Sequence, residues 1–578
     1  MTNKQWIMRF MLKHKLVFFA GFCVVTTMTL INLSYPFLNG RIINIAFYDK
    51  DMGAFLHLFL IYTCILLLNQ FVVASLNNLI ASHLMTNFLF DIRKALFYKI
   101  LHKKGVELSN MYSGDMISRM NTDATDFVNL IYWSGFWGYS NLLHIVFSVG
   151  FMFYYNVFLG IATLILVPVV YVTSKYFENK SQMINKEISK EQGKLSSYLF
   201  EIVKSLEEIR ILNVCNTVRK RYIEKTAAIN KLKVESGRMD ILAERTNALI
   251  SLIAQLLIFI ICAYFIVKKE MKLGAFVSAI SYFNMATYYF SVINGRIVDV
   301  GKQKASIQRV VDILNEEEED YKENASKCNI SEGVIDFRNV SFSYNNEKKI
   351  LNGLNIHIDS NSIVGIVGKS GAGKTTIANL LYDLYRVDKG EILIDGYNVN
   401  DFNLHYLRSQ VGVVHQETIV YENTLRYNLS FCDGKVDDDT LINAIKKVAL
   451  YDVYISLKDG LNTILGSSGH QLSSGQKQRL AIARIIIKNP KILVFDESTA
   501  FLDSQNEDII RDMMFDLAKD RTLIIISHRL STIKNCDKIV VLKNGVADGF
   551  DTHNNLIKNN RTYIDLFSEQ CIAGGEVS

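Results

Sequence analysis

The sequence has little that would bind a metal through sulfur, and it has little net charge. Its eight cysteines are scattered from Cys23 to Cys571 with no C-x-x-C pair, so we interpret them as small apolar residues in a reducing compartment. Proline is also scarce, with three in 578 residues. The net charge of +6 is small for this length. It favours weak attraction to an anionic membrane surface and gives no reason to expect nucleic acid as a partner.

Charged residues are missing altogether from five long stretches. A chain of 578 residues is too long for one hydrophobic core, so two or more domains are expected. About 20 apolar residues suffice to cross a bilayer. The third stretch is long enough for two spans with a turn near 154–156, so we predict six transmembrane helices. The five stretches are 16–40, 52–90, 127–174, 246–267 and 273–294.

The first stretch is not a signal peptide, because it exceeds the usual apolar region of about 7–15 residues and no A-x-A site follows it. Lys and Arg gather before it and in segments 91–126 and 175–240, which predicts that these parts are cytosolic. The chain is therefore expected to cross the cell membrane several times, with both termini in the cytosol. The two segments have helical patterns and are predicted to extend the membrane helices, each turning at a short tip.

The last predicted span carries polar residues spaced three or four apart, so they share one helix face. Polar groups at membrane depth are costly unless they face a partner helix or a wet cavity. Both a substrate cavity and hydrogen bonding between helices remain open for this stripe. Its residues are Ser281, Asn284, Tyr288 and Ser291.

The second half of the chain has a different pattern. The predicted membrane domain covers 1–314, and an acidic segment at 315–331 is interpreted as a solvated linker, with an acidic docking patch as the alternative. From 332 to 578, short β-rich runs alternate with helical patterns. We therefore predict an α/β domain with a largely parallel sheet.

A glycine-rich loop is the centre of that domain. Gly368 to Thr375 fits G-x-x-x-x-G-K-[ST] between a predicted strand and a predicted helix, which is the context of a phosphate-binding loop. Backbone N–H groups and the helix N-terminus would surround the phosphates of ATP. Lys374 is placed to reach the β- and γ-phosphates, and Thr375 to bind Mg²⁺. The predicted binding residues here are Gly368, Lys369, Ser370, Gly371, Ala372, Gly373, Lys374, Thr375 and Thr376.

Other candidate residues follow predicted strands. Tyr344 offers an aromatic face that could stack on adenine. Asp496 and Glu497 end an apolar strand, where Asp496 is placed to hold Mg²⁺ and Glu497 to orient or deprotonate the attacking water. Gln416 follows the predicted strand at 411–414, and His528 follows another predicted strand and is placed to contact the γ-phosphate.

A serine-rich helix start completes the set. The sequence 472–476 reads LSSGQ and opens a predicted helix, whose hydroxyl and backbone N–H groups would suit phosphate. The predicted binding residues are Ser473, Ser474, Gly475 and Gln476.

The order of these motifs resembles that of an ATP-binding cassette (ABC) exporter half-transporter over essentially the whole chain. Tyr344 matches the A-loop, 368–375 the Walker A loop, Gln416 the Q-loop and His528 the switch histidine. The Q-loop match implies that Gln416 serves in metal binding and catalysis. The remaining matches are 472–476 to the signature motif, Asp496 and Glu497 to Walker B, and 500–503 to the D-loop. The resemblance implies a type IV exporter fold, with a six-helix membrane domain followed by a P-loop ATPase domain.

The resemblance also implies a dimer. Each ATP would lie between the Walker A loop of one chain and the signature motif of the other, and ATP would close the two domains and switch the pathway from inward-facing to outward-facing. A homodimer is favoured, with a non-identical second half-transporter as the alternative.

Three departures from the family pattern bear on activity. Ser474 stands where glycine is usual, 466–469 lacks a Glu-Arg pair, and the D-loop reads Ala500-Phe501-Leu502-Asp503. Ser474 is expected to slow one site. Because the Walker A lysine, Gln416, Glu497 and His528 are all present, we still predict an active ATPase.

The leading hypothesis is therefore ATP-driven export of an amphipathic peptide, drug or lipid. A lipid flippase, or an ATP-gated channel or sensor of the same architecture, is the alternative. A soluble cassette ATPase is disfavoured by the uncharged spans. With no peptidase-like region before the first span, we do not expect the chain to process a leader peptide.

Overall fold

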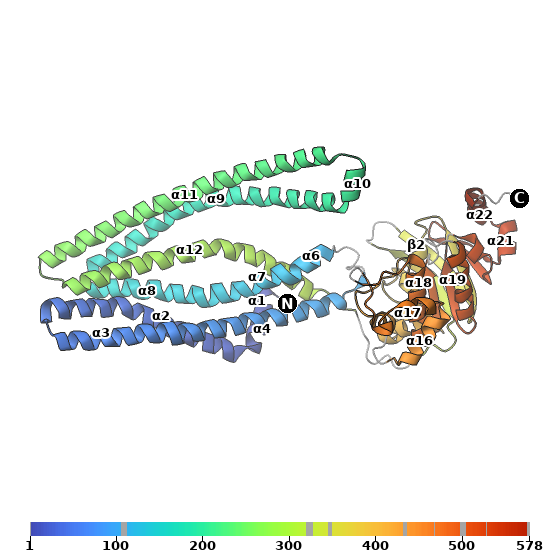
Figure 1. The fold of residues 1–578 in the computed structure, drawn as a ribbon, viewed down its shortest axis with the longest axis horizontal. Coiled ribbons are helices and arrows are strands. Elements are labelled where there is room, and N and C mark those ends of the chain that lie inside the picture. Colours follow the sequence, from blue (N-terminus) through green and yellow to red (C-terminus); the bar gives the residue numbers. More distant parts are fainter. Residues whose placement is uncertain are drawn as a thin grey trace. The chain divides into compact units, whose positions relative to one another are not determined.

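The computed structural model describes residues 2–105, 113–319, 328–344, 349–431, 436–466, 469–496, 504–527 and 529–574. Its contacts divide the chain into two compact units. The first holds Met1–Leu101 and Tyr112–Glu316, and the second holds His102–Met111 and Glu317–Ser578. Figure 1 shows that the first unit is helical and that the second mixes helices and strands.

The first unit is a set of long helices with short connections. Among its described residues, three helical runs include π-helical segments: η1 (Ile45–Asp49) follows α2, η2 (Leu68–Val73) joins α3 to α4, η3 (Arg119–Asp123) joins α6 to α7, and η4 (Leu130–Trp137) joins α7 to α8. Its α-helices are α1 (Asn3–Lys13), α2 (Lys15–Asn44), α3 (Met52–Leu67), α4 (Ala74–Leu101), α6 (Ser113–Ser118), α7 (Ala124–Asn129), α8 (Gly138–Tyr155), α9 (Val157–Lys204), α10 (Leu206–Ile211), α11 (Cys215–Val267) and α12 (Leu273–Asn315).

Helices occur at all six predicted spans. Among the residues that the structure describes, four helical stretches are long and apolar enough to cross a membrane, and α9 begins with a shorter apolar stretch, Val157–Val169. The remaining predicted span lies in α12. The four stretches are Lys15–Asp49, Met52–Leu101, Gly114–Tyr155 and Cys215–Val267.

The predicted turn between the third and fourth spans is confirmed. Helix α8 ends at Tyr155, and the side chain of Asn156 caps α9 by accepting a hydrogen bond from the backbone N–H of Phe158 at 2.8 Å. An asparagine in extended backbone conformation satisfies one of the N–H groups that a helix start leaves unpaired.

The predicted extension of the fourth and fifth spans is also confirmed. Helices α9 and α11 have 48 and 53 residues and run side by side to the short helix α10 (Figure 1). At 1.5 Å per residue, each is about 70–80 Å long, more than twice the thickness of a bilayer core. The predicted tip between spans two and three lies partly at 106–112, outside the described residues.

Small residues allow α2 and α12 to pack closely. A Cβ atom added to Gly40 would lie 2.5 Å from the carbonyl oxygen of Gly274, and one added to Gly274 would lie 1.9 Å from that of Gly40. Side chains of α12 also bond to α2: Ser278 donates to the carbonyl oxygen of Pro36 and Tyr282 to that of Leu33, each at 2.7 Å. Within a bilayer, an apolar side chain gains little by leaving lipid for a neighbouring helix. Close backbone packing and hydrogen bonds between helices therefore hold the helices together.

The second unit contains two sheets. The antiparallel sheet has the order β2-β1-β4-β5, and the larger sheet has the order β10-β9-β3-β8-β7-β6. Five neighbouring strands of the larger sheet, from β9 to β6, are parallel, which confirms the predicted parallel core. The strands are β1 (Ile335–Ser343), β2 (Lys349–Ile358), β3 (Ile363–Gly368), β4 (Lys389–Ile394), β5 (Tyr397–Asn398), β6 (Val411–Val414), β7 (Ile492–Asp496), β8 (Thr522–Ile526), β9 (Lys538–Lys543) and β10 (Val546–Asp551).

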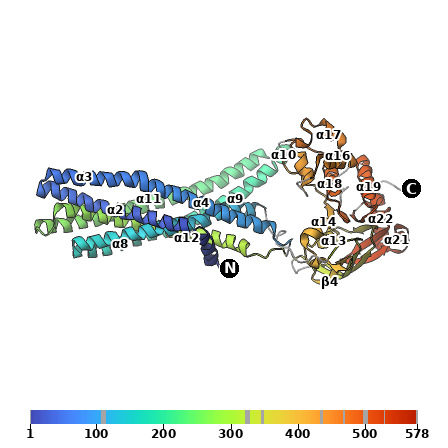
Figure 2. The same ribbon diagram turned by 90° about the horizontal axis from the view of Figure 1, so that it is seen from below.

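The larger sheet is covered on both faces. Along β7, Ile492 and Val494 belong to one hydrophobic core, while Leu493 and Phe495 belong to the other. Helix α13 (Lys374–Leu381) packs in the first core with the antiparallel sheet, and α18 (Ser474–Lys488) packs in the second. The two helices therefore lie on opposite faces of the sheet (Figure 2).

Shorter helices complete the second unit. Two of them, α15 and α16, pack beside α18, and α21 packs against β10. They are α14 (Leu404–Gln410), α15 (Leu425–Ser430), α16 (Asp438–Lys447), α17 (Tyr451–Ser456), α19 (Ser504–Leu517), α20 (Leu530–Ile533), α21 (His553–Asn559) and α22 (Arg561–Gly574).

The acidic segment after α12 is not simply solvated. Helix α12 ends at Asn315, and the Glu319 side chain, 8% exposed, forms an ion pair with Arg408. Glu319 is thus held in an ion pair within the second unit, whereas the side chain of the nearby Glu317 is 77% exposed. Residues 320–327 lie outside the described part of the chain.

We expect Gly40→Val to destabilise the membrane unit by about 1–3 kcal/mol, the usual cost of overpacking. The added side chain would meet backbone atoms of α12, which cannot move aside without shifting the helix. Thermal unfolding of the purified protein in detergent would show this as a lower midpoint. Gly150→Val is the matched control, because the same change in α8 meets no atom within 4 Å. Equal midpoints would contradict the close packing of α2 on α12.

Candidate functional site

The parallel sheet brings several predicted site residues to one edge. Strand register pairs Ile366 with Ile526, Ile526 with Asp496, and Phe495 with Val414. All four strands therefore end at the same edge, where open α/β sheets bind their ligands. The glycine-rich loop follows β3, Asp496 ends β7, and Gln416 follows β6 with an exposed side chain.

The glycines of the loop are required by its shape. Gly371 and Gly373 have φ angles of +80° and +101°, which side chains disfavour. At Gly368, a Cβ atom would lie 2.6 Å from the carbonyl oxygen of Leu542 on the neighbouring strand β9. The loop thus turns closely against the sheet and leads directly into α13, whose N-cap is Gly373.

The Lys374 ammonium group lies inside this turn. Its Nζ donates hydrogen bonds to the carbonyl oxygens of Gly368 at 2.9 Å and Lys369 at 3.3 Å, and the residue is 6% exposed. A buried positive charge held by the loop, at the N-terminus of a helix, favours an anion at this position. Of the other predicted loop residues, Ala372, Gly373 and Thr376 are buried, whereas Lys369, Ser370, Gly371 and Thr375 are exposed.

Tyr344 is connected to the start of α13. Its hydroxyl and the Thr376 hydroxyl are 3.0 Å apart, within hydrogen-bond distance. Its ring makes edge contacts with Phe342 and Tyr385, at centroid distances of 4.9 and 5.1 Å. The structure thus brings Tyr344 and Thr376 together, as expected if both serve one ligand.

Asp496 is buried, and it influences a residue that the sequence analysis missed. Burial, followed by the nearby Asp496 carboxylate, raises the pKa of Tyr382 to about 12. Tyr382 therefore stays protonated at neutral pH and donates a hydrogen bond to Asn379 at 2.6 Å. Tyr382 follows α13 without any motif of its own, so only the fold reveals that it lies near the carboxylate.

The residues of the LSSGQ sequence form the start of α18. Ser473 is its N-cap: its hydroxyl accepts from the backbone N–H of Gln476, and the Gln476 side chain accepts from the backbone N–H of Ser473. This capping box leaves the Ser473 hydroxyl proton available to a ligand. Ser473 and Ser474 are exposed, and Gly475 is buried. Because α18 lies on the opposite face of the sheet from α13, this helix start belongs to a different layer from the glycine-rich loop.

Some predicted residues lie outside the described part of the chain. These are Glu497, residues 500–503 and His528, together with Ser467 and Ser468 of the segment before the LSSGQ sequence. The roles expected of them stay predictions.

The polar stripe of the last predicted span lies on an outward face of α12. Asn284, Tyr288 and Ser291 are exposed within this single chain, Tyr288 by 63%, whereas Tyr282 and Phe283 on the same helix are buried. Ser281 is half-buried and bonds back to Val277 of its own helix at 2.9 Å. The stripe thus faces away from the core of its own unit.

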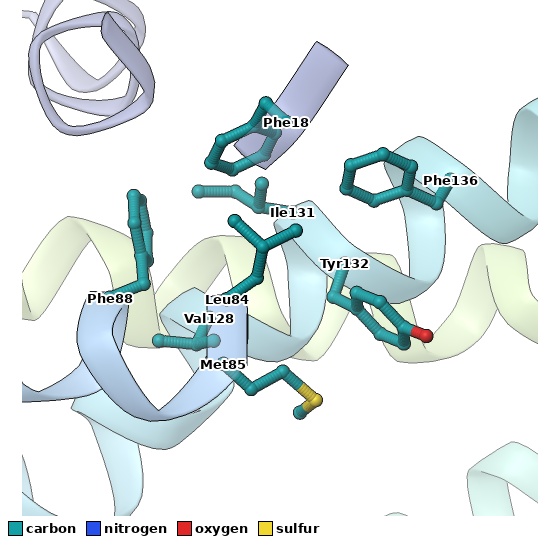
Figure 3. A pocket seen from close by; sticks show the side chains of 8 residues that line it. All are labelled: Phe18, Leu84, Met85, Phe88, Val128, Ile131, Tyr132 and Phe136. Atoms are coloured by element: carbon teal, nitrogen blue, oxygen red, sulfur yellow. The ribbon is translucent and has the colours of Figure 1, made fainter. Parts of the chain in front are cut away.

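An apolar pocket in the membrane unit is a packing gap. It lies among α2, α4, α7 and η4, and its volume is about 10 Å³, room for about one water molecule. In Figure 3 the side chains around it are apolar apart from the Tyr132 hydroxyl, so little is available to orient a substrate. Its lining residues are Phe18, Leu84, Met85, Phe88, Val128, Ile131, Tyr132 and Phe136.

Known proteins resemble both units. Residues 18–290 match the family model described as ABC transporter transmembrane region, and residues 351–500 match the model described as ABC transporter. YgaD of Bacillus subtilis (strain 168), described as a multidrug export ATP-binding/permease protein, is 30% identical over 83% of each chain. A Staphylococcus aureus (strain bovine RF122 / ET3-1) protein with the same description is also 30% identical, over 83% of this chain and 84% of its own.

A solved structure shares the fold. A bacterial Atm1-family ABC exporter with ATP bound has a TM-score of 0.82 and 23% sequence identity, and the match covers 96% of this chain and 98% of that one. The likeness extends over both units and supports a helical membrane region followed by an α/β nucleotide-binding region.

Gly368→Ala is expected to weaken binding of a fluorescent ATP analogue by about tenfold or more, equivalent to about 1.4 kcal/mol. The methyl group would push the loop away from the Leu542 backbone and displace the carbonyl oxygens of Gly368 and Lys369 that hold the Lys374 ammonium group. A fluorescence titration of the full-length protein measures the affinity. Gly371→Ala is the control: it meets no atom within 4 Å, so only its φ angle opposes the change, and we expect a smaller loss. A larger loss for the control would contradict the assigned packing.

Proposed function

This chain belongs to the ABC transporter family and is an ATPase of the translocase class, and we propose that it is one half of an exporter that moves an amphipathic drug, peptide or lipid out across the cell membrane by alternating access. The family membership supports an exporter in which the membrane region and the ATP-binding region share one chain. The described multidrug function of its relatives favours small amphipathic substrates.

The observation that carries the dimeric part of this proposal is the separation of two helix starts. The loop before α13 and the N-terminus of α18 both offer groups that bind phosphate, yet they lie on opposite faces of one sheet. One chain therefore presents two halves of a site in different layers. A second chain, related to the first by a two-fold axis, would place its LSSGQ helix against the glycine-rich loop of the first chain. The LSSGQ helix of the first chain would lie in the same way against the loop of the second.

Within each site the chain's residues have distinct proposed roles. Lys374 holds the β- and γ-phosphates, and Tyr344 supports the adenine. Glu497 orients the attacking water, and His528 contacts the γ-phosphate; both lie outside the described residues.

A metal ion fits the oxygen donors at this edge. The buried Asp496 carboxylate, the exposed Thr375 hydroxyl and the exposed Gln416 amide are hard oxygen ligands of the kind that Mg²⁺ prefers. These three residues would hold Mg²⁺, which when bound neutralises negative charge on the phosphates. Asp496 is held in place at the end of a fully buried strand.

The proposed transport step uses the long helices. Closing two nucleotide-binding regions on ATP would move the ends of the helices that extend beyond the bilayer, and the pathway would open to the outside. The stripe at Ser281, Asn284, Tyr288 and Ser291 is the proposed substrate surface, since three of its residues are exposed in the single chain. Two identical chains are the simplest assembly, and a non-identical partner is the alternative.

Transport can be measured in inverted membrane vesicles with the dye ethidium, an amphipathic cation. We expect ATP-dependent accumulation by the wild-type protein and about a tenth or less with Glu497→Gln, because loss of the water-orienting carboxylate blocks turnover. Equal uptake by the two proteins would contradict the exporter proposal and favour a channel or sensor.

Composite sites can be tested by pairing two defective chains. Lys374→Ala and Ser473→Arg should each abolish ATPase activity in a homodimer. Co-expressed with different tags and purified through both, the two chains would form dimers with one intact site of two, so about half of wild-type activity is expected if the sites are independent. Dimers of Lys374→Ala with itself, purified in the same way, are the control. No recovery in the mixed dimer would show that loop and LSSGQ helix do not act across chains.

A further inference from the structure

The acidic residues after α12 form a strap with the residues after α4. The backbone N–H of Glu319 donates to the carbonyl oxygen of His102 at 2.8 Å, and Lys103 pairs with Glu318 as in an antiparallel sheet. Lys104 also forms an ion pair with Glu317. We use the name strap for residues 102–105 and 317–319, all of which belong to the second unit.

The strap is attached to the C-terminal end of α13 through one arginine. The two carboxylate oxygens of Glu319 accept hydrogen bonds from the two Nη atoms of Arg408, both at 2.7 Å. Arg408 also donates to the carbonyl oxygens of Tyr382 at 3.3 Å and Asp383 at 3.2 Å, which directly follow α13. A bidentate pair with a carboxylate that is 8% exposed fixes both distance and direction.

A second contact brings the strap close to the same chain segment. A Cβ atom added to Gly105 would lie 2.2 Å from the carbonyl oxygen of Leu384, so the two backbones touch. Beside them is a cavity of about 230 Å³. Tyr385, which contacts the Tyr344 ring, is among its lining residues. The lining residues are Lys104, Glu319, Asp383, Leu384, Tyr385, Arg386 and Leu404.

We propose that Arg408 and Glu319 are positioning residues that transmit the nucleotide-dependent movement of α13 to the membrane helices. Helix α13 has only eight residues and begins at Lys374. A helix this short moves as one rigid body, so a shift at its N-terminus also moves Tyr382 and Asp383, to which Arg408 donates. The strap is covalently continuous with α4 at Leu101 and with the end of α12 at Glu316. This inference rests on the proposed transport function and adds a connection within one chain.

The fluorescence of the protein's own tryptophans can be used to follow this connection. Its only three tryptophans, Trp6, Trp133 and Trp137, belong to the first unit. The Trp6 indole donates to the Asn315 side chain at 2.9 Å, at the last residue of α12. Tryptophan emission therefore reports on the membrane unit, and on the end of α12 in particular, when nucleotide binds to the other unit.

The experiment measures tryptophan emission of the full-length protein in lipid nanodiscs before and after Mg-ATP with vanadate. We expect a change in the wild type that falls about fivefold or more in Glu319→Arg and Arg408→Glu, as loss of a coupling free energy would produce. Steady-state ATPase activity should stay within about twofold of wild type, because the pair acts at the far end of α13 from the proposed phosphate site.

Two further variants separate coupling from folding. Arg426→Glu makes the same charge change in a surface pair with Asp438 of this unit, and it should leave the emission change intact. Glu319→Gln keeps the side-chain shape, so it tests the ion pair if a charge-reversed chain fails to fold; we expect a reduced change with normal ATPase activity.

The outcomes distinguish the two proposals. Single variants with a full emission change would overturn the role of this ion pair and leave the exporter proposal standing. Wild-type protein that hydrolyses ATP with no emission change would overturn the ATP-driven rearrangement of the membrane unit, and the proposed connection with it.

Discussion

Burial of a parallel sheet on both faces determines where the candidate nucleotide site lies. Strands β3, β7 and β8 carry side chains that alternate between two hydrophobic cores, and Val494, Phe495 and Leu523 have no exposed surface. A slip of one residue in any strand would exchange these faces, so the register is strongly specified. The same register brings the ends of β3, β7 and β8 to one edge. The stability of the sheet and the placement of Lys374 and Asp496 thus have one physical origin.

Much of this arrangement could be predicted from local sequence patterns. The uncharged stretches, the turn at Asn156 and the glycine-rich loop each depend on residues within a few positions of one another, and the structure contains all three. The positions of Gly371 and Gly373 have a local cause as well, since their φ angles are positive. Gly368 is different, because the contact that excludes a side chain there comes from Leu542, far along the chain.

Features that depend on distant residues could not be predicted. Glu319 and Arg408 are 89 positions apart, and the charge run that contains Glu319 has the composition of a solvated linker. Tyr382, which follows α13, has no motif, and its raised pKa follows from burial and from Asp496 at the end of β7. In the membrane unit the spacing of the polar stripe showed that its residues share a face of α12. Only the packing of Tyr282 and Phe283 shows which face is covered by the same chain.

The unusual Ser474 can be understood from its place in the fold. It is the first residue of α18, directly after the N-cap, and it has helical backbone geometry that any L-residue adopts. Glycine is therefore not required there by the chain itself, unlike at Gly371 or Gly373. The Ser474 side chain is exposed, so the serine costs the folded chain little. Its consequences must arise from whatever approaches this helix start, which in the proposed dimer is a phosphate held by the second chain. In that dimer the departure would bear on the rate of a composite site and on the choice of partner, while the fold of the ATPase unit is unaffected.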